Sequence, residues 1–368
     1  SYSQNKELMF IKILIGELKM FKKYFKNIVL ISCLLNFSYA GTIRSQGTAG
    51  ASQLLIPVGA ENIALGGSNI ATVSGVDALY INPAGTSGLT SGAQVSVSNM
   101  TYLADIDVTY AGIATPLGDF GNVGLSVKSL DFGEIAVTTA TETEGTGAFY
   151  SPSFITATAN YSKSFADNVR FGTNIKFVTE KIMNTGASGL ALDLGVQYEF
   201  NELPLGIGVS LKNLGGRMSY DGSDLEQNHV PEESESGSLN ERFRITAQSF
   251  ELPAQLDIGL SLNAIENLSV LASYTNNSFS SNVLGFSGKY TLGTLWVAGG
   301  FSSVSPIGNK DDFTEESWDN MTESIYGGNF GLGASVAVGE LMLDIGYSVR
   351  MVTNYFENNN VLELSLNF

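Results

Sequence analysis

Few residues of this chain could carry out catalysis. His229 is the only histidine and Cys33 the only cysteine. A Ser/His/Asp triad needs a histidine beside its partners, and His229 lies in a long acidic loop, so we interpret it as a surface histidine. The sequence has no HExxH motif, phosphate-binding loop or paired cysteines. It therefore predicts a protein that is not an enzyme, with no catalytic residues, no cofactor and no metal site.

Carboxylates are concentrated in two loops, 214–253 and 304–325. The first carries eight acidic residues against three arginines, and the second six against one lysine. Carboxylates at this density could hold Ca²⁺, but their spacing matches no EF-hand loop, so we expect a solvated, flexible loop in each case. Binding surfaces often lie on loops carried by a rigid scaffold. An extracellular partner is therefore expected to dock on these two loops.

Other charged residues occur inside segments in which apolar and polar residues alternate. A Lys or Arg facing lipid at mid-membrane costs about 2–4 kcal/mol, so these charges are expected to point into an enclosed lumen. There they would pair with one another or anchor a plug; the alternative is an ion-selective pore lining. The residues in question are Asp107, Arg170, Lys176, Asp193, Lys212, Asp257, Asp344, Arg350 and Glu363.

The alternation has a period of two and recurs through most of the chain. After the first forty residues no stretch reaches the roughly 18 consecutive apolar residues of a membrane-spanning helix. Period-two alternation instead predicts strands with one apolar and one polar face. We predict fourteen, at 93–99, 106–115, 121–131, 154–164, 168–180, 189–200, 205–213, 254–264, 267–276, 281–290, 293–303, 326–338, 340–351 and 360–368.

The connections between these strands alternate in length. Tight turns at 116–121, 165–168, 201–204, 264–267, 291–293 and 338–340 take turns with mostly longer loops, the largest being 132–153, 214–253 and 304–325. Bacterial outer-membrane barrels have an even number of strands, short periplasmic turns and long external loops. The sequence therefore predicts an all-β, fourteen-stranded antiparallel transmembrane barrel over 93–368, in contact with outer-membrane lipid.

Composition and the N-terminal region agree with an exported membrane protein. Charged residues make up 15% of the chain, below the usual quarter of a soluble protein, and the net charge of −17 disfavours nucleic acid as a partner. We set residues 1–19 aside as an upstream extension. Residues 20–40 read as a Sec signal peptide that ends in Ser38-Tyr39-Ala40. A lipoprotein motif at Leu30–Cys33 is the competing interpretation.

The segment between this leader and the first strand, 41–92, is predicted to be a plug inside the barrel. It is apolar but interrupted by Pro57, Gly59 and glycines further along, so only short helical turns are possible. A segment this apolar and irregular needs a surface to pack against. Its motif residues are Gly66, Gly67, Asp77, Tyr80, Asn82, Pro83, Ala84 and Gly85.

This motif resembles the start of the mature PorV/PorQ proteins, which belong to the wider FadL-like group of outer-membrane barrels. The resemblance covers nearly all of the mature chain. The chain's ending is also similar to the signal read by the barrel-assembly machinery, with Leu364, Leu366 and Phe368 on one face of the last strand. The PorV likeness implies a non-enzymatic component of type IX secretion that receives and hands over secreted cargo. The wider likeness implies the alternative, passive transport of hydrophobic small molecules.

Overall fold

The described part of the chain is a closed barrel of fourteen antiparallel strands. The computed structural model describes residues 47–368 except 91, 230–240, 306–309, 313 and 354–355. The strands are β1 (Gln94–Thr101), β2 (Asp107–Pro116), β3 (Asn122–Asp131), β6 (Ser153–Ala166), β7 (Val169–Ile182), β8 (Thr185–Glu199), β9 (Leu205–Gly215), β13 (Gln255–Ile265), β14 (Leu268–Asn277), β15 (Asn282–Leu292), β16 (Leu295–Ser305), β17 (Tyr326–Val338), β18 (Leu341–Val352) and β19 (Asn359–Asn367).

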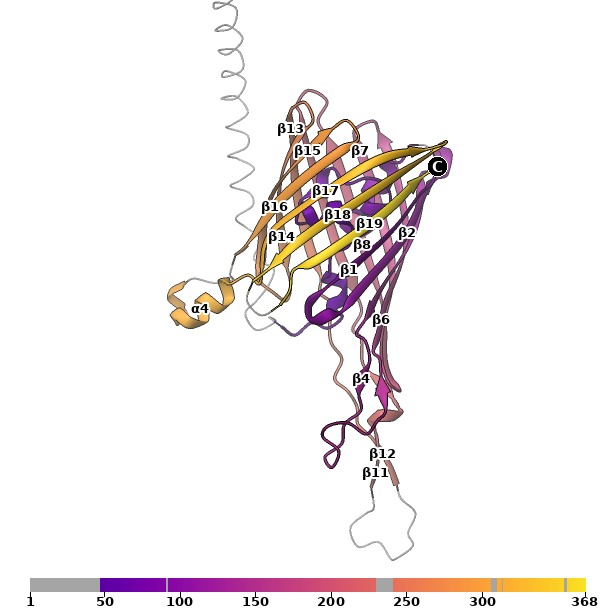
Figure 1. Cartoon of the computed structure of the whole chain (residues 1–368), viewed down its shortest axis with the longest axis vertical. Helices are drawn as coiled ribbons and strands as arrows, with labels where there is room; N and C mark the ends of the chain where they lie inside the picture. Colours follow the sequence, from indigo (N-terminus) through magenta and orange to yellow (C-terminus); the bar gives the residue numbers. More distant parts are fainter. Residues whose placement is uncertain (1–46, 91, 230–240, 306–309, 313, 354–355) are drawn as a thin grey trace, which may run out of the picture. The chain divides into compact units, whose positions relative to one another are not determined.

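Each strand pairs with the next along the chain, and β1 pairs with β19 to close the ring (Figure 1). All fourteen predicted segments are confirmed, and so is the fold class. The predicted leader and upstream extension, 1–40, lie outside the described residues. Within the described residues, no helix has both the length and the apolar character needed to cross a membrane.

Small elements lie in the long loops and near the first turns. They are η7 (Leu103–Asp105), η8 (Gly118–Phe120), β4 (Ile135–Ala136), β5 (Phe149–Tyr150), β10 (Asp221–Gly222), η9 (Ser223–Leu225), β11 (Glu226–His229), β12 (Glu241–Arg244), η10 (Lys310–Asp312) and α4 (Glu315–Thr322). The acidic loops were expected to lack structure. Their described parts instead form a hairpin, β11–β12, and the short helix α4, both at the end of the barrel away from the C-terminus (Figure 1).

Six short helical turns lie inside the ring of strands, drawn in indigo in Figure 1. They are η3 (Ser52–Leu55), α2 (Ala60–Ala64), η4 (Asn69–Ala71), η5 (Gly75–Asp77), α3 (Ala78–Ile81) and η6 (Pro83–Gly88). Glycines on the wall let this segment approach closely. A Cβ on Gly172 would lie 2.2 Å from the carbonyl oxygen of Pro83, and one on Gly208 would lie 2.3 Å from that of Ile70. The segment is hereafter called the plug.

Charged residues on the wall mostly point into the lumen, as expected. Lys176 pairs with Asp193 and Lys212 with Asp257, each pair at 2.6 Å and buried. Asp107 is the exception. It is exposed and shares the outward face of β2 with Thr109 and Ala111, while Val108 and Tyr110 face inward. Asp107 is the first residue of β2, where the strand leaves the loop, so its carboxylate reaches water without turning inward.

The plug enters the barrel at the long-loop end and leaves it at the short-turn end. At its start, the Gly47 amide donates to the Phe279 carbonyl at 2.9 Å, and Ala49 bridges Glu251. Glu251 lies in the long loop 214–253, and Phe279 lies in the β14–β15 connection at the same end of the barrel. At its end, the side-chain amide of Asn122 donates to the Leu89 carbonyl at 2.6 Å, beside the short turn that precedes β3.

This direction predicts the accessibility of the plug's first residues. Outer-membrane barrels turn their long loops outward. We expect a cysteine at the exposed Thr48 to react with a membrane-impermeant thiol reagent on intact cells, and one at Glu340, in a short turn, to react only after the outer membrane is permeabilised. Labelling of Glu340→Cys but not Thr48→Cys on intact cells would reverse the orientation.

Candidate functional site

The candidate site is the interface between the plug and the inner wall of the barrel. Asn82 is its centre. The Asn82 Nδ2 group donates to the carbonyls of Ile70, at 2.9 Å, and Val196 on β8, at 3.1 Å. The Asn82 Oδ1 atom accepts from the Ala84 amide at 3.2 Å and caps η6, in which Pro83 is the first residue. Proline suits this position because it has no amide hydrogen to satisfy. One side chain therefore orders the plug and attaches it to the wall.

The remaining predicted plug residues lie close to Asn82 or at turns of the same segment. Gly66 and Gly67 end α2 with φ of 58° and 72°, a left-handed conformation that favours glycine. A Cβ on Gly85 would lie 2.1 Å from the Val73 carbonyl oxygen. The Tyr80 hydroxyl donates to the Leu54 carbonyl at 3.3 Å, and the ammonium groups of Lys128 and Lys212 lie 4.7 and 5.4 Å from its ring centre. Ala84 is fully buried.

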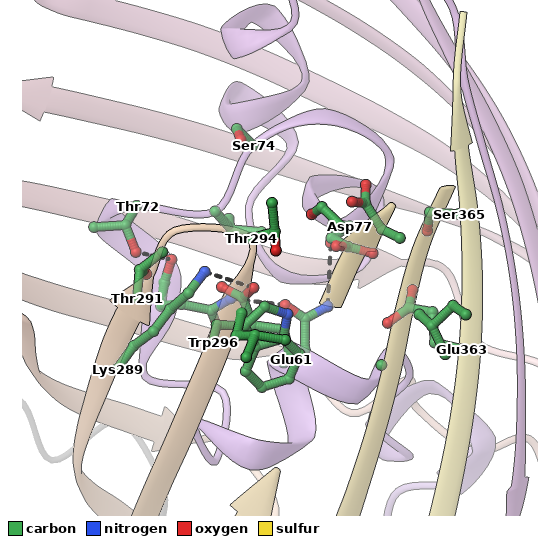
Figure 2. A pocket seen from close by; sticks show the side chains of 18 of the residues that line it. Glu61, Thr72, Ser74, Asp77, Lys289, Thr291, Thr294, Trp296, Glu363 and Ser365 are labelled. Carbon is green, nitrogen blue, oxygen red and sulfur yellow. Dashed lines mark hydrogen bonds and ion pairs between the residues drawn. The ribbon is translucent and has the colours of Figure 1, made fainter. Parts of the chain in front are cut away.

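The lumen beside the short turns is polar. A cavity of about 340 Å³ separates the plug from β15–β19 (Figure 2). Glu61 on α2 forms an ion pair with Lys289 on β15 at 2.6 Å. Glu363 on β19 accepts from the Ala60 amide at 2.6 Å and from the Ser96 hydroxyl at 2.7 Å. A second cavity, of about 440 Å³, includes Arg170 and Glu199.

The Asp77 carboxyl of the plug and the Glu363 carboxyl of β19 both line the first cavity. The pKa of Asp77 lies well above its ordinary value, first because the group is buried and then because the Glu363 charge lies beside it. Two carboxyls in contact cannot both ionise without strong repulsion. Burial and this repulsion therefore favour the protonated form of Asp77.

A cluster of apolar side chains lies in the lumen beside the long loops. Inward-facing Met100, Val108, Leu130 and Val361 pack against Ile56, Val58 and Ile63 of the plug. A cavity of about 170 Å³ lies at the rim between the start of the plug and the loops at 253–255 and 277–280, with Leu55, Pro253 and Phe279 in its walls. Most of the surface of this rim cavity is apolar.

The pairing between β16 and β17 covers only part of the two strands. In the described residues, the β16–β17 pairing runs from Leu295 opposite Ala334 to Gly300 opposite Asn329. On its other edge, β16 continues to Ser305 and pairs with β15 as far as that residue. The β17–β18 pairing also shifts between Tyr326 and Asn329. We call the unpaired edge, 301–305 and 326–328, the seam. Plug residue Gly66 lies against Asn329 at its inner end.

The two sets of predicted site residues lie apart. The plug motif is gathered in the lumen. Leu364 and Phe368 face outward, 46% and 59% exposed, and Leu366 lies between them on the same face of β19. Their role as an assembly signal stays a prediction. Sequence reasoning missed the cavity residues Glu61, Lys289 and Trp296, because no local pattern marks residues that meet only when the barrel closes.

The described residues contain no set of three or more His, Cys, Asp or Glu side chains placed to hold a metal ion.

No family model matches the chain, and a search of curated proteins finds no match. Solved structures do match it. The monoaromatic hydrocarbon channel CymD aligns with a TM-score of 0.55 at 12% identity, over 85% of this chain and 98% of that one.

The toluene transporter TodX of Pseudomonas putida aligns with a TM-score of 0.54 at 15% identity, over 84% of this chain and 97% of that one. A FadL homologue of Pseudomonas aeruginosa aligns with a TM-score of 0.51 at 12% identity, over 85% and 98%. The chain has the fold of FadL-like outer-membrane barrels. Identities this low show the fold alone, so the outer-membrane location and the PorV/PorQ likeness stay predictions.

Removing Asn82 tests its role in this FadL-like barrel. Asn82→Ala leaves the Ala84 amide without its acceptor, at a cost of about 1–3 kcal/mol, and removes the donor that ties the Ile70 carbonyl of the plug to the Val196 carbonyl of the wall. We expect the plug to loosen, with a higher ion conductance in planar bilayers. Asn99→Ala is the matched control, since Asn99 is exposed and bonds only Thr109 on the outer face. Equal conductance of the two variants would contradict the assignment.

Proposed function

We propose that this chain is a non-enzymatic outer-membrane barrel that lets small hydrophobic molecules cross passively. The observation that carries the proposal is the apolar cavity at the outer rim. Its volume of about 170 Å³ is close to the roughly 150 Å³ of an engineered apolar cavity that binds benzene. A small aromatic or aliphatic molecule arriving from outside would meet this cavity first, beside the start of the plug.

The polar cavities at the periplasmic end argue against a straight path through the lumen. A hydrophobic molecule that passed Glu61, Lys289, Arg170 and Glu199 would displace the water that solvates these charged groups. It could form no hydrogen bonds in place of that water, so the passage would be unfavourable. The seam between β16 and β17 supplies another exit, because it is the edge at which the described wall lacks continuous pairing. A molecule leaving there would enter the hydrocarbon of the membrane. CymD and TodX, named for monoaromatic hydrocarbons and toluene, favour the same class of substrate.

Cargo handling in type IX secretion, implied by the PorV/PorQ likeness, is the second candidate. One observation favours it: hairpin β11–β12 and helix α4 project from the external end, where a secreted protein could dock on loops 214–253 and 304–325 (Figure 1). Purified barrel in liposomes separates the two functions. Transport predicts faster uptake of a hydrocarbon than of a polar solute of equal size, whereas cargo handling predicts no difference and capture of signal-bearing cargo from outer membranes.

Filling the rim cavity tests the proposed entry. Ala254→Phe puts a ring into the space between Leu55 and Phe279. We expect toluene uptake into liposomes to fall about tenfold while the barrel remains folded by circular dichroism. Ala136→Phe, at an exposed position in the loop strand β4, is the control and should leave uptake unchanged. Normal uptake by folded Ala254→Phe would remove this cavity from the route.

Closing the seam tests the proposed exit. If the β16–β17 register continued past Gly300, Ser302 would lie opposite Gly327. We expect a short bifunctional thiol reagent to cross-link Ser302→Cys/Gly327→Cys and to block hydrocarbon uptake, with recovery after cleavage of the linker. The control is Leu284→Cys/Ser303→Cys, which joins two strands already paired at these residues. Unchanged uptake through the cross-linked seam would show that molecules leave elsewhere.

A further inference from the structure

The polar cavity at the periplasmic end has the features of a binding site of its own. Its walls come from the plug, from strands β15–β19 and from Gly293 and Thr294 in the short turn after β15 (Figure 2). This turn places the cavity at the periplasmic face, at the opposite end of the barrel from the rim cavity. Its volume of about 340 Å³ exceeds that of a single bound water by an order of magnitude.

One buried acceptor in this cavity has no donor. Asn62 Nδ2 donates to the backbone carbonyls of Val58, at 3.1 Å, and Asp77, at 3.4 Å. Because carbonyls only accept hydrogen bonds, the side-chain nitrogen of Asn62 must be the atom that faces them, and its oxygen points the other way. Asn62 Oδ1 then accepts from Asn69 Nδ2 at 2.7 Å. The Asn69 Oδ1 atom is left without a partner among the described residues, on a side chain only 2% exposed that lines the cavity.

A second acceptor and an excess of negative charge lie in the same cavity. Asp77 Oδ1 also has no partner among the described residues. The Glu61 carboxylate is compensated by Lys289. The Glu363 carboxylate lines the same cavity and forms no ion pair among the described residues, and burial together with its charge raises the pKa of Asp77. Asp344 adds another negative charge, and among the described residues its side chain accepts from a neutral amide, that of Asn367 at 2.6 Å.

We propose that this cavity binds a small organic dication with primary ammonium ends, taken from the periplasm. Each ammonium group carries three donors and no acceptor, which matches walls that offer free acceptors and two uncompensated negative charges. The Trp296 ring supplies an apolar surface for the chain between the two ends. The site is independent of the proposed hydrocarbon route, because it lies at the other end of the lumen.

Calorimetric titration of the purified full-length barrel with 1,4-diaminobutane tests this proposal. We expect saturable binding at one site, no binding of 1,4-butanediol, and affinity about tenfold lower in Asp344→Asn, which removes one charge and keeps the shape. Glu340→Gln removes a carboxylate from the periplasmic turn outside the cavity and should bind as the parent does. Failure to bind the diamine, or equal binding of the diol, would overturn the proposal.

A tethered cation gives a second, independent readout. Ser335→Lys puts an ammonium group into the cavity from β17, and Ser335→Gln puts in a neutral side chain that is nearly as long. We expect the lysine variant to lose diamine binding and to unfold at a higher temperature than the glutamine variant. Diamine binding retained by folded Ser335→Lys would place the ligand elsewhere. Hydrocarbon uptake should remain unchanged in both, which separates this test from that of transport.

Discussion

The rest of the structure depends on the need to satisfy every backbone polar group in an environment without water. A strand in hydrocarbon has no solvent to bond its amides and carbonyls, so the sheet must close on itself. Here closure is made by the pairing of β1 with β19 and continues around the ring through β8 and β9. The outward face is then free to be apolar, and polar residues are forced into the lumen.

The same requirement explains the inward polar residues of the wall. The plug is irregular, so its carbonyls lack partners of their own, and side chains of the wall supply them. Gln197 donates to the carbonyls of Ile70 and Val73, Asn174 to Leu79 and Lys128 to Ile56. These residues are therefore part of the packing between plug and wall. Glycines on neighbouring strands bring the two backbones close enough for these bonds.

The lumen is divided by this plug into two regions of opposite character. The external region contains an apolar cluster and a rim cavity the size of a small hydrocarbon. The periplasmic region holds carboxylates, amides and one compensating lysine in a larger space. A molecule suited to one region is excluded from the other by desolvation. A hydrophobic route that leaves through the wall and an amine site that opens to the periplasm can thus coexist in one barrel.

Strand number, strand bounds and the antiparallel barrel follow from the sequence, because the period-two alternation and the loop lengths are local properties that lipid on one side imposes. The plug motif was also recognisable, since Gly66, Asn82 and Pro83 act within one short segment. The seam at Gly300 and Asn329, the rim cavity and the contact of Asp77 with Glu363 were decided only by the tertiary structure. These features join residues up to nearly three hundred positions apart, and their geometry exists only once the ring has closed around the plug.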